Sequence, residues 1–194
     1  MNLSNYFWSF SGVLTPKFCD DVIKYALSKE EVMARTGGYG DKKLNKEEVK
    51  NLYKKRRSDL VWLSEPWIYK ELHPYVHMAN KNAGWNFQLG LPDETQFTIY
   101  NKNQFYDWHS DSFPEPFKNG SIRKISSTLL LNDPLEFKGG EFWFSIEEDR
   151  KICEELNSKG SLVVFPSFIR HKIAPITKGT RYSMVTWNNG DPWK

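Results

Sequence analysis

The chain has 194 residues, of which 39% are hydrophobic and 26% charged, and its formal net charge is +3. This composition is typical of a globular protein, and the length predicts a single domain over 1–194 with a supporting part, 1–90, and a strand-rich core, 91–194. No apolar run approaches the roughly 18 residues that span a bilayer, and the N-terminus does not resemble a signal peptide. The lack of such a run predicts no membrane partner. Because Cys19 and Cys153 form no spaced pair, we expect a reducing, cytoplasmic location.

Helix signals are concentrated in the supporting part. Three helices are predicted, over 16–29, 45–53 and 66–82. Thr15 before a proline predicts the first N-cap, Asn45 with Glu48 resembles a capping box, and Ser64 is the expected cap of the third helix. Pro74 is expected to kink or break that third helix.

A glycine-flanked basic segment, 37–57, lies between the first and third predicted helices. It begins with Gly37-Gly38-Tyr39-Gly40 and then carries a cluster of basic residues: Lys42, Lys43, Lys46, Lys50, Lys54, Lys55, Arg56 and Arg57. A solvated helix with charged flanks accounts for this pattern, and so does a basic lid that closes over a substrate. Tyr53 is the one aromatic residue interleaved with the basic helix, which argues against nucleic acid as a partner.

The second half of the chain is predicted to consist mostly of strands. Seven short segments alternate with turn residues, at 94–100, 106–111, 122–132, 140–144, 161–165, 171–174 and 181–187, and residues 59–63 are a further candidate. Closely spaced short strands favour an antiparallel sandwich or barrel. With the leading helices, they predict an α+β fold.

A histidine and an aspartate lie two positions apart in Asp-Trp-His-Ser-Asp. In a strand, His109 and Asp111 would point to the same face, and His171 begins a later strand. Two histidines and one carboxylate on one side of a metal leave open positions, as in the facial triad of non-haem iron(II) oxygenases. His73 and His77, spaced as on one helix face, lack an accompanying carboxylate or cysteine, so a structural or surface role is predicted for them.

Arg181 lies on the strand that follows His171. A guanidinium fixed deep in a barrel needs a carboxylate partner, which a dicarboxylate cosubstrate would supply.

Four segments resemble the 2-oxoglutarate oxygenase superfamily, and within it the prolyl-4-hydroxylase-like group. They are Tyr-Asn-Lys-Asn-Gln-Phe-Tyr-Asp-Trp-His-Ser-Asp at 100–111, Leu-Leu-Asn-Asp at 130–133, Gly-Gly-Glu at 139–141, and the run from His171 through Arg181 to Trp187. The resemblance implies a double-stranded β-helix, or jelly-roll, catalytic core with supporting N-terminal helices.

The resemblance also implies roles for individual residues. His109, Asp111 and His171 would hold Fe(II), and Arg181 with Tyr100, Ser126 and Thr128 would bind 2-oxoglutarate. Leu130 stands where some relatives have a tyrosine. Arg123 and Trp187 would contact the substrate.

The implied reaction is hydroxylation with O2, Fe(II) and 2-oxoglutarate, releasing succinate and CO2, with ascorbate in support. A peptidyl proline is the expected substrate, within a peptide or protein partner. The same chemistry on a free amino acid, a lysine side chain or another small molecule is an alternative. So is a jelly-roll module that binds without catalysis, although the intact triad and Arg181 argue against it.

Overall fold

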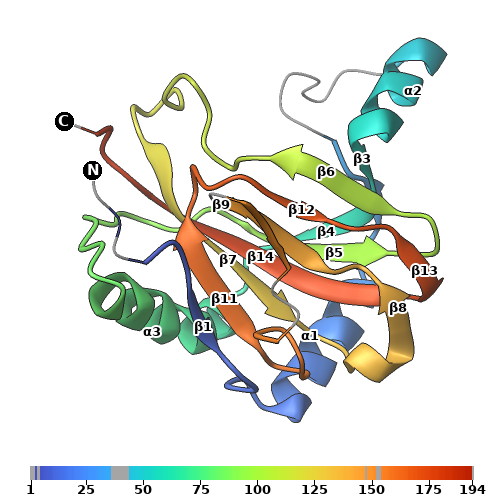
Figure 1. Ribbon diagram of the computed structural model, residues 1–194, viewed down its shortest axis with the longest axis horizontal. Coiled ribbons are helices and arrows are strands. Elements are labelled where there is room, and N and C mark those ends of the chain that lie inside the picture. The colour runs from blue at the N-terminus through green and yellow to red at the C-terminus, as the bar shows by residue number, and fades with distance from the viewer. Residues whose placement is uncertain (1–2, 4, 36–43, 147, 152–153, 194) are drawn as a thin grey trace.

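The computed structural model describes residues 3, 5–35, 44–146, 148–151 and 154–193, and two antiparallel sheets dominate it (Figure 1). The larger sheet has the strand order β1 (Trp8–Phe10), β11 (Leu162–Pro166), β7 (Ile122–Leu130), β14 (Arg181–Gly190), β5 (Thr95–Tyr100), β4 (Asp59–Leu63), β2 (Val32–Met33). The smaller sheet has the order β10 (Glu148–Lys151), β9 (Phe142–Ile146), β12 (His171–Ile173), β6 (Phe105–His109), β3 (Arg56–Arg57). A two-stranded ribbon pairs β13 (Ile176–Gly179) with β8 (Phe137–Gly139), which follows the 3-10 turn η1 (Pro134–Glu136). The predicted α+β class with a jelly-roll core is confirmed.

Each face of the larger sheet has its own apolar core. On the outer face, side chains such as Phe97, Leu129 and Met184 pack against α1 (Pro16–Leu27) and α3 (Pro66–Asn82), which lie below the sheet in Figure 1. On the inner face, Leu130 and Phe165 pack against the smaller sheet. Burying each large apolar side chain contributes about 1.5–3 kcal/mol, so the two cores hold the sheets and helices together.

Two of the three predicted helix starts agree with the structure. The hydroxyl of Thr15 accepts a hydrogen bond from Phe18 N at 3.2 Å at the start of α1. Asn45 and Glu48 form the predicted capping box at the start of α2 (Lys46–Lys55). The cap of α3 was predicted wrongly, because Glu65 and not Ser64 occupies the N-cap position, without a side-chain cap bond.

Pro74 does not break α3, which runs without interruption from Pro66 to Asn82. A proline in a helix leaves the carbonyl oxygen four residues earlier without its N–H donor. Here Lys70 and Pro74 are both exposed, so water can satisfy that carbonyl oxygen.

The segment 37–57 is described only in its second half. Residues 44–57 form α2 and β3, and β3 pairs with β6 through Arg56↔Tyr106 and Arg57↔Phe105. Gly37, Gly38 and Gly40, the proposed hinge of a lid, lie outside the described residues, as does Cys153. The lid therefore stays a prediction, whereas the docking of β3 on the smaller sheet is a feature that the sequence did not predict.

Candidate metal and cosubstrate site

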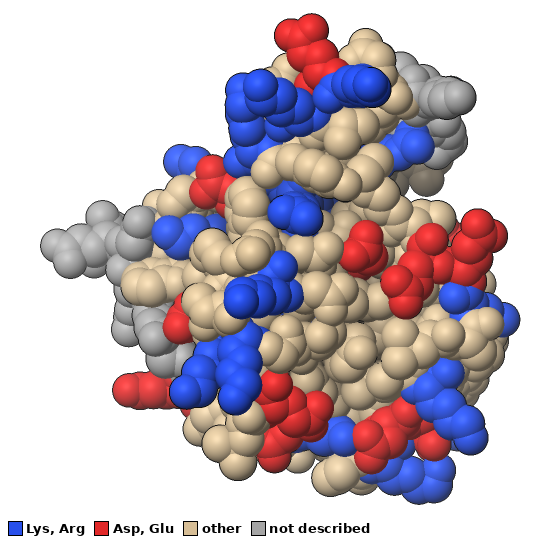
Figure 2. Space-filling model, turned by 90° about the vertical axis from the view of Figure 1, so that its right-hand side faces the viewer, with Lys and Arg blue, Asp and Glu red and all other residues tan. Residues whose placement is uncertain are grey.

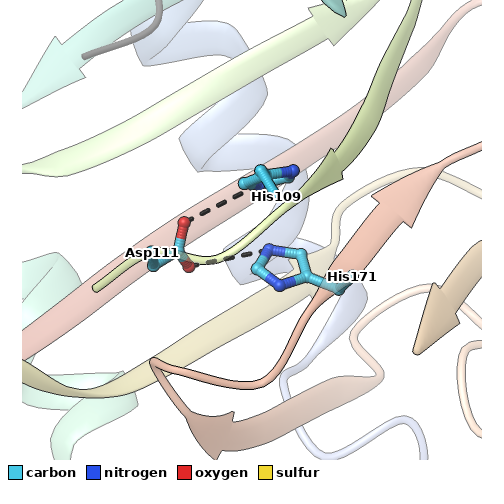
Figure 3. Close-up of side chains that lie close together, drawn as sticks. All are labelled: His109, Asp111 and His171. Carbon is cyan, nitrogen blue, oxygen red and sulfur yellow. Dashed lines mark ion pairs between the residues drawn. The ribbon is translucent and has the colours of Figure 1, made fainter. Parts of the chain in front are cut away.

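Three side chains that could hold a metal ion lie close together: His109, Asp111 and His171 (Figure 3). His109, at the end of β6, is the cross-strand partner of His171, at the start of β12. Asp111 lies just beyond β6, so the prediction that it extends from the same strand was wrong. Its position is set by the turn after β11, because the backbone N–H groups of Asp111 and Ser112 donate to Ser167 O at 2.9 and 3.0 Å.

The ligand atoms of the three side chains lie within 4.8 Å of one another. Nε2 of His109 is 3.7 Å from one carboxylate oxygen of Asp111, and Nε2 of His171 is 3.6 Å from the other. These separations are too long for strong hydrogen bonds. They are close to the roughly 3.0–3.4 Å that separates neighbouring ligands bound to one ion at about 2.1 Å. Among the described residues this is the one cluster that could hold a metal ion.

Burial shifts the pKa values of two of these groups. It lowers the pKa of His109 to about 3, with the neighbouring His171 acting in the same direction, so the ring is neutral near pH 7. Burial alone would raise the pKa of Asp111, but His171, His109 and Arg123 outweigh it, and the net direction is downward. One oxygen of this carboxylate, Oδ2, is buried without a hydrogen-bond partner. The neutral imidazole of His109 and an unsatisfied carboxylate oxygen of Asp111 fit a divalent ion such as Fe(II).

Arg181 is a buried cation at the start of β14, where it is the cross-strand partner of Tyr100 on β5. Its side chain is 2% exposed, Nη1 has no hydrogen-bond partner, and none of the ion pairs among the described residues includes it. Burial lowers the pKa of Arg181 to about 10, which still leaves it charged near pH 7. The Tyr100 ring lies 5.9 Å from the guanidinium carbon. A buried, unpaired guanidinium fits one carboxylate of a dicarboxylate ligand.

A cavity of about 1110 Å³ connects the triad with the mouth of the site. Ser183, Val185 and Trp187 line it from β14, and Thr128 lines it from the neighbouring β7. Arg181 belongs to the same face of β14, since alternate residues of a strand share a face. The cavity therefore has one wall that leads from Trp187 toward the buried arginine.

Ser126 and Leu130, on the same face of β7 as Thr128, do not line the cavity. Ser126 Oγ donates to Ser167 Oγ at 2.9 Å, and the backbone oxygen of Ser167 in turn accepts from Asp111 N. Leu130 packs in the core between the sheets. A direct contact of Ser126 with the cosubstrate stays a prediction.

Arg123 and Trp187 lie together on the cavity wall. The guanidinium carbon of Arg123 is 3.8 Å from the centre of the Trp187 ring, and Nε is 3.0 Å from Oδ2 of Asp93. Asp93 thus pairs the charge of Arg123 and fixes its orientation. Trp187 keeps a buried Nε1–H donor without a partner.

Two further residues line the cavity wall: Tyr106, which sequence reasoning did not single out, and Arg56, which it considered only as part of a basic lid that could reach a substrate. The ring of Tyr106 stacks on that of His109 at a centroid distance of 3.4 Å. The guanidinium carbon of Arg56 lies 4.5 Å from the centre of the same Tyr106 ring. Tyr106 lies three residues before His109 in the quoted segment 100–111, where it could have been singled out. Arg56 belongs to the basic segment that the sequence explained either as a solvated helix or as a substrate-facing lid, and the structure buries it where β3 pairs with β6.

A family model described as the 2OG-Fe(II) oxygenase superfamily matches residues 95–189, the span that carries the triad and Arg181. Over this span, just under half of its length, the chain is similar to that superfamily. A PKHD-type hydroxylase of Xylella fastidiosa is 35% identical over 111 residues, which are 52% of this chain and 47% of that relative. The PKHD-type hydroxylase PiuC of Pseudomonas aeruginosa is 31% identical over 94 residues, 47% of this chain and 41% of that relative. The chain thus spans about half the length of the curated relatives that it matches.

Solved structures show that the likeness in fold extends beyond this oxygenase segment. The viral collagen prolyl hydroxylase of Paramecium bursaria Chlorella virus-1, in its 2OG complex, has a TM-score of 0.70 at 18% identity. The match covers 96% of this chain and 97% of the viral chain. A prolyl hydroxylase of Trichoplax adhaerens, in complex with a peptide fragment of hypoxia inducible factor, has a TM-score of 0.63 at 16% identity. The match covers 95% of this chain and 84% of the Trichoplax chain. No helix in the described part of the chain is long and apolar enough to cross a membrane.

Proposed function

We propose that this oxygenase uses Fe(II), O2 and 2-oxoglutarate to hydroxylate a substrate, most simply a peptidyl proline, and releases succinate and CO2. The convergence of His109, Asp111 and His171, with ligand atoms within 4.8 Å, carries the proposal. The match to the oxygenase family model and the similarity to hydroxylase relatives support it.

Each residue has a distinct task in this proposal. The Nε2 atoms of His109 and His171 and the carboxylate of Asp111 hold Fe(II) from one side, which leaves its other positions open. When bound, iron and 2-oxoglutarate supply the oxidative chemistry that inserts one oxygen atom into the substrate. Arg181 pairs with the carboxylate of 2-oxoglutarate that is remote from the metal, and Tyr100 and Thr128 line the space between them.

The walls of the cavity exclude water and orient the substrate. Trp187 and Tyr106 line the cavity with aromatic side chains that suit the apolar ring of a proline. Arg123, held by Asp93, offers donors beside Trp187 for a peptide carbonyl oxygen. The prolyl hydroxylase of Trichoplax adhaerens, with a peptide fragment in its complex, gives this choice of substrate further support.

The test is incubation with Fe(II), ascorbate and 2-oxoglutarate against a library of proline-containing peptides. We expect succinate to form and one peptide class to gain the mass of one oxygen atom. An Asp111→Ala variant serves as the control and should do neither. If the wild-type protein binds no divalent metal and forms no succinate with or without peptides, the proposed function is wrong.

A further inference from the structure

Arg56 is a second buried cation in the cavity and has no counter-charge. Its side chain is 4% exposed and lines the cavity, and its Nη2 is buried without a hydrogen-bond partner. Its Nε donates to Ser58 Oγ at 2.9 Å, which fixes the guanidinium but leaves its charge unpaired. No ion pair within the described part of the chain includes it. Buried charges are costly unless an opposite charge accompanies them.

The proposed iron and cosubstrate do not supply that opposite charge. Two positive charges on Fe(II) and one on Arg181 balance the carboxylate of Asp111 and both carboxylates of 2-oxoglutarate, with the metal-bound histidines neutral. Arg123 is already paired with Asp93 at 3.0 Å. With these groups in place, the positive charge of Arg56 is the one that stays unbalanced. The substrate is the remaining ligand of the cavity, so it is the group that can neutralise this charge.

The surroundings of Arg56 add to this positive potential. Arg35 and Lys55 line the same cavity, on the side of β2 and α2. Lys and Arg side chains also gather over α2, at the top of the face in Figure 2. A cationic rim raises the local concentration of anionic ligands and steers them inward.

We infer that the substrate of this oxygenase carries a carboxylate that pairs with Arg56 while the reacting carbon faces the iron site. The inference rests on the proposed function and narrows its substrate class. The Arg56 guanidinium lies on the Tyr106 ring, which in turn stacks on His109, so a carboxylate bound there belongs to a group close to the reacting atom. In a peptide this is an acidic residue beside the proline, and in a free amino acid it is the α-carboxylate.

Matched acid and amide probes test the pairing by binding, without turnover. The protein is loaded with Mn(II) and 2-oxoglutarate in the absence of oxygen, and ligand affinity is measured by calorimetry. One arm compares blocked peptides that differ only in glutamate or glutamine beside the proline. The other arm compares L-proline with L-prolinamide. We expect the acid to bind about 10-fold or more tightly than its amide in one arm, and that arm identifies the source of the carboxylate.

Variants assign the preference to Arg56. Arg56→Gln should abolish the difference between acid and amide, and Arg56→Lys should retain part of it. Arg57→Gln is the matched control, because Arg57 is the exposed neighbour in β3 and does not line the cavity. The affinity for 2-oxoglutarate should change less than about threefold in all three variants.

Equal affinity for acid and amide in both arms, or no binding of any probe, overturns the inference. It is also wrong if Arg56→Gln weakens 2-oxoglutarate binding as strongly as Arg181→Ala, because Arg56 then belongs to the cosubstrate site. These failures leave the proposed function standing so long as 2-oxoglutarate binds in a metal-dependent way. Loss of that binding in the wild-type protein would instead refute the proposed function itself.

Discussion

His109 and His171 are oriented by the same contact, a bond from ring Nδ1 to the carbonyl oxygen two residues earlier in the chain. The acceptor is Asp107 O at 2.8 Å for His109 and Ile169 O at 2.9 Å for His171. A carbonyl oxygen only accepts, so each Nδ1 carries a proton, and Nε2 is the ring nitrogen that offers a lone pair to a metal when the imidazole is neutral. Both lone pairs are thereby fixed toward Asp111 before any metal binds.

The first prediction separates a ligand carboxylate from a nearby one. Asp111→Asn removes the negative charge of the triad and should lower Mn(II) affinity by about 100-fold or more, measured by anaerobic calorimetry. Asp107→Asn is the control, because Asp107 orients His109 through its backbone carbonyl and its side chain is exposed. Equal losses in both variants would contradict the assignment of the ligands.

The second prediction concerns the anchor of the cosubstrate. Arg181→Ala removes one partner of a desolvated ion pair, and we expect 2-oxoglutarate affinity to fall by about 100- to 1000-fold. Arg181→Lys should keep part of the affinity because it keeps the charge. The affinity is measured with metal present and oxygen absent, and Arg170→Ala, at an exposed arginine, should bind normally. Unchanged affinity in Arg181→Ala would remove Arg181 from the site.

The third prediction is a dependence of stability on pH. Cys19 is fully buried, and desolvation raises its pKa from 9.0 to about 11. The unfolded thiol ionises first, so the native state loses stability as pH rises from 9 to 11, by about 2–3 kcal/mol at most. Below pH 9 this contribution is fully present. In Cys19→Ala the pH dependence over this window should be weaker by that amount in urea unfolding. An identical pH dependence in both proteins would show that Cys19 does not titrate as expected.

Local signals explain the parts of the fold that were predicted. The caps at Thr15 and Asn45 depend on hydrogen bonds within three residues, so the sequence alone specifies them. The start of α3 depends on a distant partner. The carboxylate of Glu65 accepts a hydrogen bond from Tyr25 of α1 as well as one from Ser64 N, and no pattern in the neighbourhood of Ser64 reports this.

The candidate site likewise combines features that the local sequence predicted with features that depend on distant segments. The sequence singled out His109, Asp111 and His171, and the structure brings them together, but not for the reason of strand alternation. Asp111 is positioned by the backbone of Ser167 on another strand connection. The burial of Arg56 was not predicted, because a two-residue strand has no periodicity to detect and its burial follows from long-range pairing with β6. Local sequence patterns could not predict contacts between segments that are distant in the chain.

The last prediction tests the close fit around Arg181. Gly140 has a φ of +70°, and a Cβ there would lie 2.3 Å from Ile176 Cδ1 and 3.0 Å from Arg181 Cδ. Gly140→Ala should therefore cost about 1–3 kcal/mol of stability and also weaken 2-oxoglutarate binding by displacing the arginine. Gly120→Ala is the matched control, since Gly120 has a φ of +79° but no atom within 4 Å of its Cβ position.

Gly120→Ala should thus show the backbone cost alone, about 1 kcal/mol, with normal 2-oxoglutarate affinity. Thermal unfolding gives the stability change, and anaerobic titration of the metal-loaded protein gives the affinity. Because both substitutions place alanine at a positive φ, the difference between them isolates the contact with Ile176 and Arg181. If the two variants bind 2-oxoglutarate equally well, the segment at Gly140 does not determine the position of the Arg181 guanidinium.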